Sequence, residues 1–425
     1  MLNRFEKALL LIFLTLPTIE PAKGWIGGQS GGALQYTSTG DNARKQVRQV
    51  PVWTVVDAHN DVLLRMMEGE DIGVRTQRGH SDLPRFREGG VNVQVFSVWV
   101  DPEFKERAYQ RANEMIDSLE SLVRHHPEEI GIARSADEAE RLVREGKLAA
   151  LIGLEGGVAL DSDLARIDSL YHRGVRYIAL TWNDTTPWAS SAEDEVEHPE
   201  KFQESSKSYL RPAGLTALGR AAIHRMNELG IMVDVSHLGE RSFWDIIHES
   251  TKPIIASHSC AYSLAHHYRN LKDDQIRAIA KSGGIVCINF YPGYLDSSFE
   301  RSYAEILQKH THELDSLQAL YREDHAGYVA ARRSLLKNEI DSIRPPLSRI
   351  VDHIEYIVKL VGIDYVGLGS DFDGIGVTPI GLKDVTDFPR LTRELLDRGF
   401  SPPQVRKILG ENFLRVFRQV CGKGK

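Results

Sequence analysis

LAALIGLE, residues 148–155, is an apolar run that ends in an acid. A run of this length and composition is typical of a strand buried on both faces of a parallel sheet. Seven further apolar runs recur along the chain, each followed by a segment with helical spacing, at residues 55–61, 91–100, 175–183, 231–237, 253–258, 284–291 and 365–371. This alternation predicts parallel βαβ units. Eight such units close most simply into a (β/α)8 TIM barrel.

The positions of polar residues favour a barrel over a doubly wound open sheet, which the periodicity alone would also fit. Seven of the eight runs end in His, Asp, Glu, Asn, Ser or Tyr. In a (β/α)8 barrel the C-terminal ends of the strands meet at one mouth, which carries the catalytic groups. We therefore expect these side chains to gather at one site.

Helices are expected between the strands at residues 106–125, 164–173, 216–229 and 273–282, with Gly230 and Gly283 as C-terminal stops. Segment 292–360 is much longer than an ordinary barrel crossover. Its pattern over 302–343 predicts an inserted pair of helices that Pro345 and Pro346 terminate. This helical insertion, residues 292–350, follows the seventh strand. It could serve as a lid, as an oligomer contact or as solvated decoration.

The composition indicates a soluble globular protein with a small-molecule partner. Of 425 residues, 42% are hydrophobic and 26% are charged, which supplies material for a large core. The net charge is −7 and no basic block is interleaved with aromatic residues, so no binding to nucleic acid is expected. Cys260, Cys287 and Cys421 are too few for a disulfide framework. A homodimer stays open.

The N-terminal residues predict export. Arg4 and Lys7 precede an apolar run over residues 8–16 and then Pro17, in the order of a secretory signal peptide. The run is too short to span a bilayer. We expect a signal peptide over 1–24, a flexible linker over 25–49 and the barrel over 50–425. The protein would then be periplasmic or secreted. A buried N-terminal helix and an uncleaved membrane anchor are the alternatives.

Five side chains at four strand ends predict a metal site. His59 and Asp61 are two residues apart and so project to the same side of an extended strand. Imidazole and carboxylate ligands together suit a divalent ion such as zinc. Glu155 follows a buried run, where an unpaired carboxylate would be costly. His237 and His258 end two further strands, and five ligands suggest two ions that share one carboxylate.

The last strand adds a candidate for proton transfer. Asp371 ends the run 365–371, opposite the first strand in a closed barrel. A carboxylate there could take a proton from an activated water and return it to a leaving amine. Asp373 could serve instead, although an aspartate that caps the turn at Gly374 explains it as well.

Taken together, these motifs resemble the membrane dipeptidase (renal dipeptidase) family, peptidase family M19, of the amidohydrolase superfamily. The resemblance runs from about residue 55 to residue 417. The matching stretches are DAHND (57–61), EGG (155–157), TPWA (186–189), DVSH (234–237), SHS (257–259), RNL (269–271), NFY (289–291) and GSDFDG (369–374).

The resemblance implies a role for each of these residues. His59, Asp61 and Glu155 would hold one zinc ion, and His237 and His258 would hold a second, with Glu155 bridging the two. Arg269 would receive the terminal carboxylate of the substrate, for which its planar fork is suited. Tyr291 and Asp371 would line the same pocket.

One stretch departs from the family pattern. A histidine follows Leu-Thr in well-studied dipeptidases of this family, where it contacts the substrate carbonyl, but this chain has LTWND at 180–184. Trp182 offers only an indole N–H. Asn183 could replace the histidine as a donor, so we expect both residues at the substrate.

These observations predict a zinc-dependent dipeptidase in which a hydroxide that bridges both metals attacks the amide and Asp371 moves the proton to the leaving nitrogen. Another amidohydrolase reaction is the alternative, such as N-acyl amino acid deacylation, hydrolysis of D-configured dipeptides or lactam opening. A non-catalytic metal-binding barrel is a further one. A cysteine hydrolase built on Cys260 is disfavoured, because a metal would occupy its base, His258.

Overall fold

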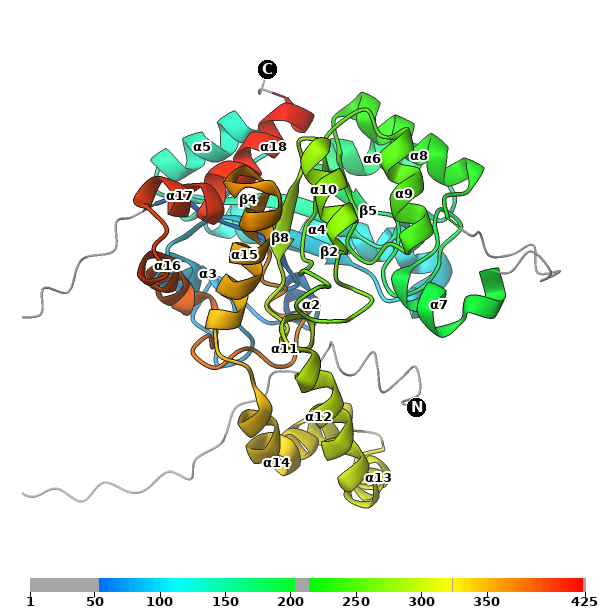
Figure 1. The fold of residues 1–425 in the computed structure, drawn as a ribbon, viewed down its shortest axis with the longest axis vertical. Helices are drawn as coiled ribbons and strands as arrows, with labels where there is room; N and C mark the ends of the chain where they lie inside the picture. Colours follow the sequence, from blue (N-terminus) through cyan, green and yellow to red (C-terminus); the bar gives the residue numbers. More distant parts are fainter. Residues whose placement is uncertain (1–52, 203–213, 323, 423–425) are drawn as a thin grey trace, which may run out of the picture.

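The computed structural model describes residues 53–202, 214–322 and 324–422, so the expected signal peptide and linker lie outside the described residues. Eight parallel strands form the predicted barrel, surrounded by helices (Figure 1). The strands are β1 (Val55–Asn60), β2 (Val91–Trp99), β4 (Leu148–Glu155), β5 (Val175–Ala179), β6 (Met232–Asp234), β7 (Ile254–Ala256), β8 (Ile285–Ile288) and β9 (Val366–Leu368).

The barrel closes between its first and last strands. Asn60 pairs with Phe372 in a parallel bridge, and the Asp61 amide donates to the Phe372 carbonyl at 2.9 Å. Asp57 strengthens this seam, because its buried carboxylate accepts from the Ser370 amide at 2.7 Å and from the Ser370 hydroxyl at 2.6 Å. Burial raises the pKa of Asp57 to about 6. The closure brings the ends of β1 and β9 together at the mouth.

Several strands are shorter than the sequence predicts, and one strand was missed. The runs 175–183 and 231–237 are strands only at Val175–Ala179 and Met232–Asp234. Their polar ends are loops, which lets the side chains turn into the mouth. The extra strand β3 (Ile130–Ile132) pairs with β4 at the side of the barrel.

The four helices expected between strands are confirmed as α4 (Ala108–His125), α6 (Ala165–Arg173), α8 (Ala217–Leu229) and α10 (Asp273–Lys281). Local signals set their ends. The Thr216 hydroxyl accepts from the Gly219 amide at 2.9 Å at the start of α8, and Gly230 ends the helix with φ +79°. The outer layer also contains α5 (Ala136–Arg144), α9 (Glu240–Glu249), α15 (Ser348–Val361), α16 (Phe388–Asp397) and α18 (Asn412–Cys421).

The C-terminal helix covers the end of the barrel opposite the mouth. Phe413 and Phe417 of α18 are buried in one cluster with inward-facing strand residues such as Val95, Leu151 and Ile255. Phe413 and Phe417 are at most 2% exposed. This apolar cluster fills the end of the barrel opposite the mouth. The polar strand ends, with the carboxylates that follow β1 and β9, lie at the mouth.

The insertion after β8, the seventh barrel strand, projects away from the barrel (Figure 1). It contains a single turn, α11 (Pro292–Leu295), and three longer helices, α12 (Ser297–Lys309), α13 (Thr311–Leu320) and α14 (His325–Ile343). The predicted pair is therefore three helices, because the chain breaks at His310 as well as after Leu320. No helix among the described residues is long and apolar enough to span a membrane.

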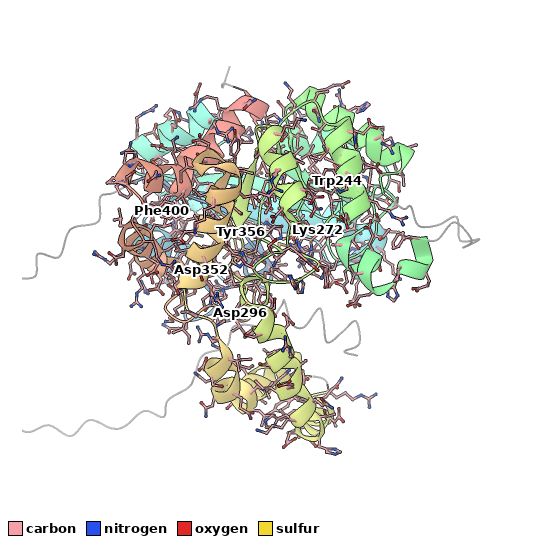
Figure 2. All side chains as sticks on the ribbon, in the orientation of Figure 1. Trp244, Lys272, Asp296, Asp352, Tyr356 and Phe400 are labelled. Atoms are coloured by element: carbon pink, nitrogen blue, oxygen red, sulfur yellow. The ribbon has the colours of Figure 1, made fainter. Side chains whose placement is uncertain are left out.

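An ion-pair cluster fastens the insertion to the barrel. Arg349 of α15 lies between Asp296, at 3.1 Å, and Asp352, at 3.3 Å. Figure 2 labels both aspartates at the junction where the insertion leaves the barrel. The base of the insertion is thus held against α15.

Candidate metal centre

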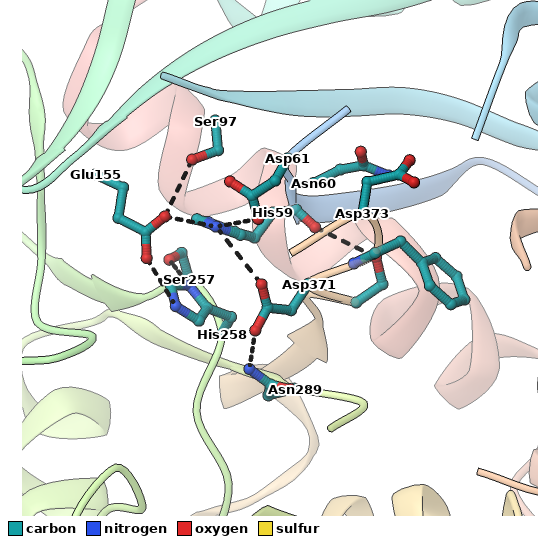
Figure 3. Close-up of polar contacts among 12 residues, drawn as sticks. His59, Asn60, Asp61, Ser97, Glu155, Ser257, His258, Asn289, Asp371 and Asp373 are labelled. Atoms are coloured by element: carbon teal, nitrogen blue, oxygen red, sulfur yellow. Dashed lines mark hydrogen bonds and ion pairs between the residues drawn. The ribbon is translucent and has the colours of Figure 1, made fainter. Parts of the chain in front are cut away.

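All five predicted ligands converge at the barrel mouth. Each is at most 5% exposed: His59, Asp61, Glu155, His237 and His258. His59 is the last residue but one of β1, Glu155 ends β4, and the two other histidines follow β6 and β7. Figure 3 shows the His59 ring between the carboxylates of Glu155, Asp61 and Asp371.

The Glu155 carboxylate lies between two groups of side chains. Its Oε2 atom is 3.2 Å from Nε2 of His59. Its Oε1 atom is 2.9 Å from Nε2 of His237 and 3.4 Å from Nε2 of His258. Asp61 Oδ2 is 3.4 Å from the same His59 nitrogen. One carboxylate oxygen therefore faces each group, which is the arrangement that two ions sharing a carboxylate need.

Hydrogen bonds behind the histidines set their tautomers. His59 Nδ1 lies 2.8 Å from the Tyr177 hydroxyl, which itself donates to the Ala58 carbonyl. Because that hydroxyl donates elsewhere, it accepts from His59 Nδ1–H. This leaves the Nε2 lone pair of His59 directed into the site, where a metal would bind it.

The two other histidines are held in the same way. His237 Nδ1 lies 2.9 Å from the amide oxygen of Asn183, which can only accept. His258 Nδ1 lies 2.8 Å from the Ser257 hydroxyl, whose proton goes to Asp234. Burial and the nearby Arg269 lower the pKa of His237 to about 3. Both rings are therefore neutral, with Nε2 facing Glu155, which is the form that binds metals.

The donor set fits divalent ions. His59 Nε2 and Asp61 Oδ1 are buried and have no hydrogen-bond partner, although buried polar atoms almost always have one. Ligand atoms of His59, Glu155 and His258 lie within 4.8 Å of one another, as do those of His59, Asp61 and Asp371. Three buried carboxylates in one site are costly unless cations compensate them.

Asp371 lies at the edge of this site. Its Oδ2 atom accepts from Asn289 Nδ2 at 2.8 Å, and its Oδ1 atom is 4.0 Å from Nε2 of His59. Burial raises the pKa of Asp371 well above its usual value, with Asp61 and Glu155 adding to the shift against the effect of His59. A carboxyl whose pKa is raised in this way is suited to exchange a proton with a group beside it.

Asp373, the alternative for proton transfer, is occupied elsewhere. Its carboxylate accepts from Arg65 Nη1 at 3.2 Å and from the His80 amide at 2.7 Å. It therefore holds the loop after β9 in place. This geometry favours Asp371 for proton transfer.

Backbone strain marks the same positions. His237 and Asp371 have φ values of +67° and +61°, in the left-handed region that residues other than glycine rarely adopt. Such conformations persist where the surrounding structure enforces them, often at functional sites. Here the strain turns each side chain from its strand end into the mouth.

Aromatic side chains form the wall of the pocket above the ligands. The pocket has a volume of about 30 Å³, and its walls outside the five ligands are Leu64, Trp99, Trp182, Tyr294, Asp371 and Gly374. The Trp99 and Trp182 rings meet edge to face, with centroids 4.9 Å apart. Trp182 thus lies where the family resemblance placed it.

Trp99 is a site residue that the sequence interpretation missed. It is the register partner of Glu155 across β2 and β4, so the two side chains point the same way. Its indole Nε1 is buried, has no partner and belongs to a residue that lines the pocket. Ser97, two residues earlier, donates to Glu155 at 3.2 Å. The sequence shows that Ser97 and Trp99 alternate within the run 91–100 and so share one face of a strand. It does not show the register of this strand with β4.

The residues predicted to bind substrate differ in whether they line the pocket. Arg269 is 4% exposed, stacks over the Tyr294 ring at 5.4 Å and leaves its buried Nε atom without a partner. Tyr291 is not among the residues that line the pocket, and its ring packs on Tyr294 and Phe299. Tyr294, three residues further on, lines the pocket.

The structure also shows the surroundings of Asn183 and Cys260. Asn183 reaches the site, but its amide oxygen is bonded to His237, so it orients a ligand from behind. Cys260 is fully buried, and burial raises the pKa of its thiol far above the usual range. A thiolate nucleophile is therefore not available there. All three cysteines are free.

Comparison with known proteins identifies the family. A model of the membrane dipeptidase family (peptidase family M19) matches residues 44–423. The chain belongs to this family. It is 33% identical to dipeptidase 3 of Mus musculus over 373 residues, which are 86% of this chain and 64% of the mouse protein. The chain thus spans less than two thirds of the length of that relative, and 65% of the length of its Rattus norvegicus counterpart.

Solved structures share the fold. A probable dipeptidase, PvdM, from Pseudomonas aeruginosa superposes with a TM-score of 0.71 at 27% identity, covering 87% of this chain and 96% of PvdM. A metallopeptidase from Rhodobacter sphaeroides, solved with a phosphinate mimic of the dipeptide L-Ala-D-Ala, gives 0.69 at 25% identity and covers 87% and 99% of the two chains. The barrel fold is therefore shared with these solved structures.

Proposed function

We propose that this protein is a zinc-dependent dipeptidase with two zinc ions per chain. The observation that carries the proposal is the Glu155 carboxylate, with one oxygen toward His59 and the other toward His237 and His258. Asp61 would complete the first zinc site. A bound pair of zinc ions would supply activation of a water nucleophile at neutral pH and polarisation of the scissile carbonyl.

Side chains of the protein would carry the remaining steps. Asp371 would accept the proton released during attack and deliver it to the leaving nitrogen, for which its raised pKa is suited. Asn289 holds the other oxygen of this carboxyl and so fixes its direction. Tyr177, Asn183 and Ser257 keep the histidine rings oriented during the cycle.

Substrate recognition would use the buried cation and the aromatic wall. Arg269 has an unpartnered buried Nε atom, which suits it to a substrate carboxylate. Trp99 is the register partner of Glu155 and lines the pocket, and its unpartnered N–H would donate to a substrate oxygen. This contact would compensate for Trp182 at the position of the family histidine. The Rhodobacter sphaeroides protein was solved with a mimic of L-Ala-D-Ala, and we propose dipeptides with small side chains as substrates here as well.

We also propose that the protein is exported, on the basis of the N-terminal sequence described above. Fractionation of cells that express the full chain tests this. Recovery of the protein in the cytoplasm with an intact N-terminus would contradict it.

A substrate panel on the purified full chain tests the reaction. We expect the zinc-loaded protein to hydrolyse L-Ala-D-Ala and L-Ala-L-Ala, to lose activity with a chelator and to regain it with zinc. Because a dipeptidase requires a free α-amino group, N-acetyl-L-alanine should be hydrolysed at least about a hundredfold more slowly, ~2.7 kcal/mol in transition-state binding. Preference for the N-acyl substrate or for a lactam would replace the proposal with the deacylase or lactamase alternative. No turnover of any substrate would favour a non-catalytic barrel.

A further inference from the structure

A second cavity lies outside the metal centre, between the insertion and the loop after β9. It has a volume of about 200 Å³, compared with about 30 Å³ at the metal centre. Helices α12 and α14 form one wall, and residues of the loop 376–383 form the other. The cavity therefore exists only because this chain carries the helical insertion.

Positive charge dominates the wall of this cavity. Asp341 is the single acid that lines the cavity. Five basic residues line it as well: Arg332, Arg333, Lys337, Arg344 and Lys383. Asp341 is already paired, with Lys337 and, at 2.8 Å, with Arg344. Among the described residues, Arg333 and Lys383 form no ion pair with a carboxylate. The cavity wall thus carries more positive charge than its own acid can balance.

Apolar side chains form the floor beneath the charges. Tyr303 and Leu336 are 6% and 1% exposed, and Val377 closes the opposite side. Arg332 is 8% exposed and donates to the Tyr303 hydroxyl at 3.2 Å, so one guanidinium lies at the boundary between floor and wall.

We propose that this cavity binds a small organic anion with an apolar body, such as a medium-chain carboxylate. The anionic head would lie against Arg333 and Lys383. The apolar body would lie on Tyr303 and Leu336. Charge complementarity selects the head, and the apolar side chains of the cavity favour the body, since burial of apolar surface is favourable.

The proposed ligand would lie near the loop after β9, which carries Asp371. His80 lines the cavity, and its Nδ1 atom accepts from the Asp373 amide at 3.0 Å. Asp373 is two residues from Asp371, and Gly374 lines the metal pocket. The loop after β9 therefore has the metal centre on one side and the second cavity on the other.

Fluorescence of 8-anilinonaphthalene-1-sulfonate, an aromatic anion, tests the proposal on the zinc-loaded full chain. We expect one probe molecule per chain, displaced by octanoate and not by octylamine, which has the same body and the opposite charge. The double variant Arg333→Gln/Lys383→Gln should bind the probe about tenfold more weakly, ~1.4 kcal/mol. Both side chains are exposed at the mouth of the cavity, so the fold should persist, as the melting temperature will show.

A matched variant controls for net charge. Arg301→Gln/Lys359→Gln removes two exposed charges that do not line the cavity and should bind the probe as the wild type does. Equal loss in both double variants, no loss in the first, or equal displacement by octylamine would overturn the proposal. Dipeptide hydrolysis is measured separately, so failure of the anion site leaves the proposed function untouched.

Discussion

The two sides of Glu155 differ in charge. On the side of β1 and β9, His59 is accompanied by the carboxylates of Asp61 and Asp371. On the side of β6 and β7, the ligands are two neutral imidazoles, His237 and His258, with Nε2 atoms 2.9 Å apart. The β1 side can therefore attract a cation without help, whereas the β6 side obtains its negative charge from Glu155. Glu155 therefore joins the two sides into a single centre.

The variant Glu155→Gln should break this arrangement most severely. We expect kcat/KM to fall by about three orders of magnitude or more, ~4 kcal/mol, because the β6 side loses its only anionic ligand. Zinc content by mass spectrometry should fall from two ions to one per chain. Glu195→Gln is the matched control, since that partly buried acid accepts from Ser190 away from the centre. Two retained zinc ions in the Glu155 variant would contradict the account.

The variant Asp371→Asn separates proton transfer from metal binding on the β1 side. We expect kcat to fall by about 10²–10⁴-fold while two zinc ions remain, because general acid–base catalysis has this magnitude. Asp373→Asn should instead lower the melting temperature, since that carboxylate holds Arg65 and His80. Full activity of the Asp371 variant would assign the proton transfer to another group.

Variants of the residues that hydrogen-bond to His59 and His237 should weaken zinc binding on one side of Glu155 at a time. Tyr177→Phe removes the acceptor of His59, and Asn183→Ala removes the acceptor of His237. Each should weaken zinc binding about 10–100-fold on its own side only. Competitive titration with a chelator should then show one weakened and one unchanged ion in each variant. Weakening of both ions by either change would mean that the sides do not act separately.

The smallest effect is expected at Trp99. Trp99→Phe keeps an aromatic ring beside Trp182 but removes the unpartnered N–H. Loss of one hydrogen bond of about 1 kcal/mol corresponds to a roughly fivefold lower kcat/KM, through a higher KM. Trp244→Phe, on helix α9 away from the pocket, should have no effect. Unchanged kinetics of the Trp99 variant would show that its N–H does not contact the substrate.

The sequence predicted the barrel because parallel strands leave long apolar runs, as at 148–155. It predicted where the ligands gather because polar residues end these runs. It overestimated strands such as 231–237, where the left-handed backbone at His237 ends the regular structure early. It missed β3, because a three-residue strand carries almost no pattern.

Other features depended on relations between distant strands. Trp99 was missed because only the register of β2 with β4 places it beside Glu155. Tyr177 belongs to an apolar run, and its contact with His59 requires Gly153, where a Cβ atom would come within 2.1 Å of the Tyr177 ring. Tyr294 was not identified as a pocket residue because the turn of α11 after β8 was not foreseen. Periodicity carries no information about such pairings.

Anomalous diffraction at the zinc absorption edge, from crystals of the zinc-loaded protein, tests the shared carboxylate most directly. We predict two peaks per chain: one beside His59 and Asp61, and one beside His237 and His258, with a Glu155 oxygen next to each. A single peak, or a second peak that Glu155 does not touch, would contradict the account.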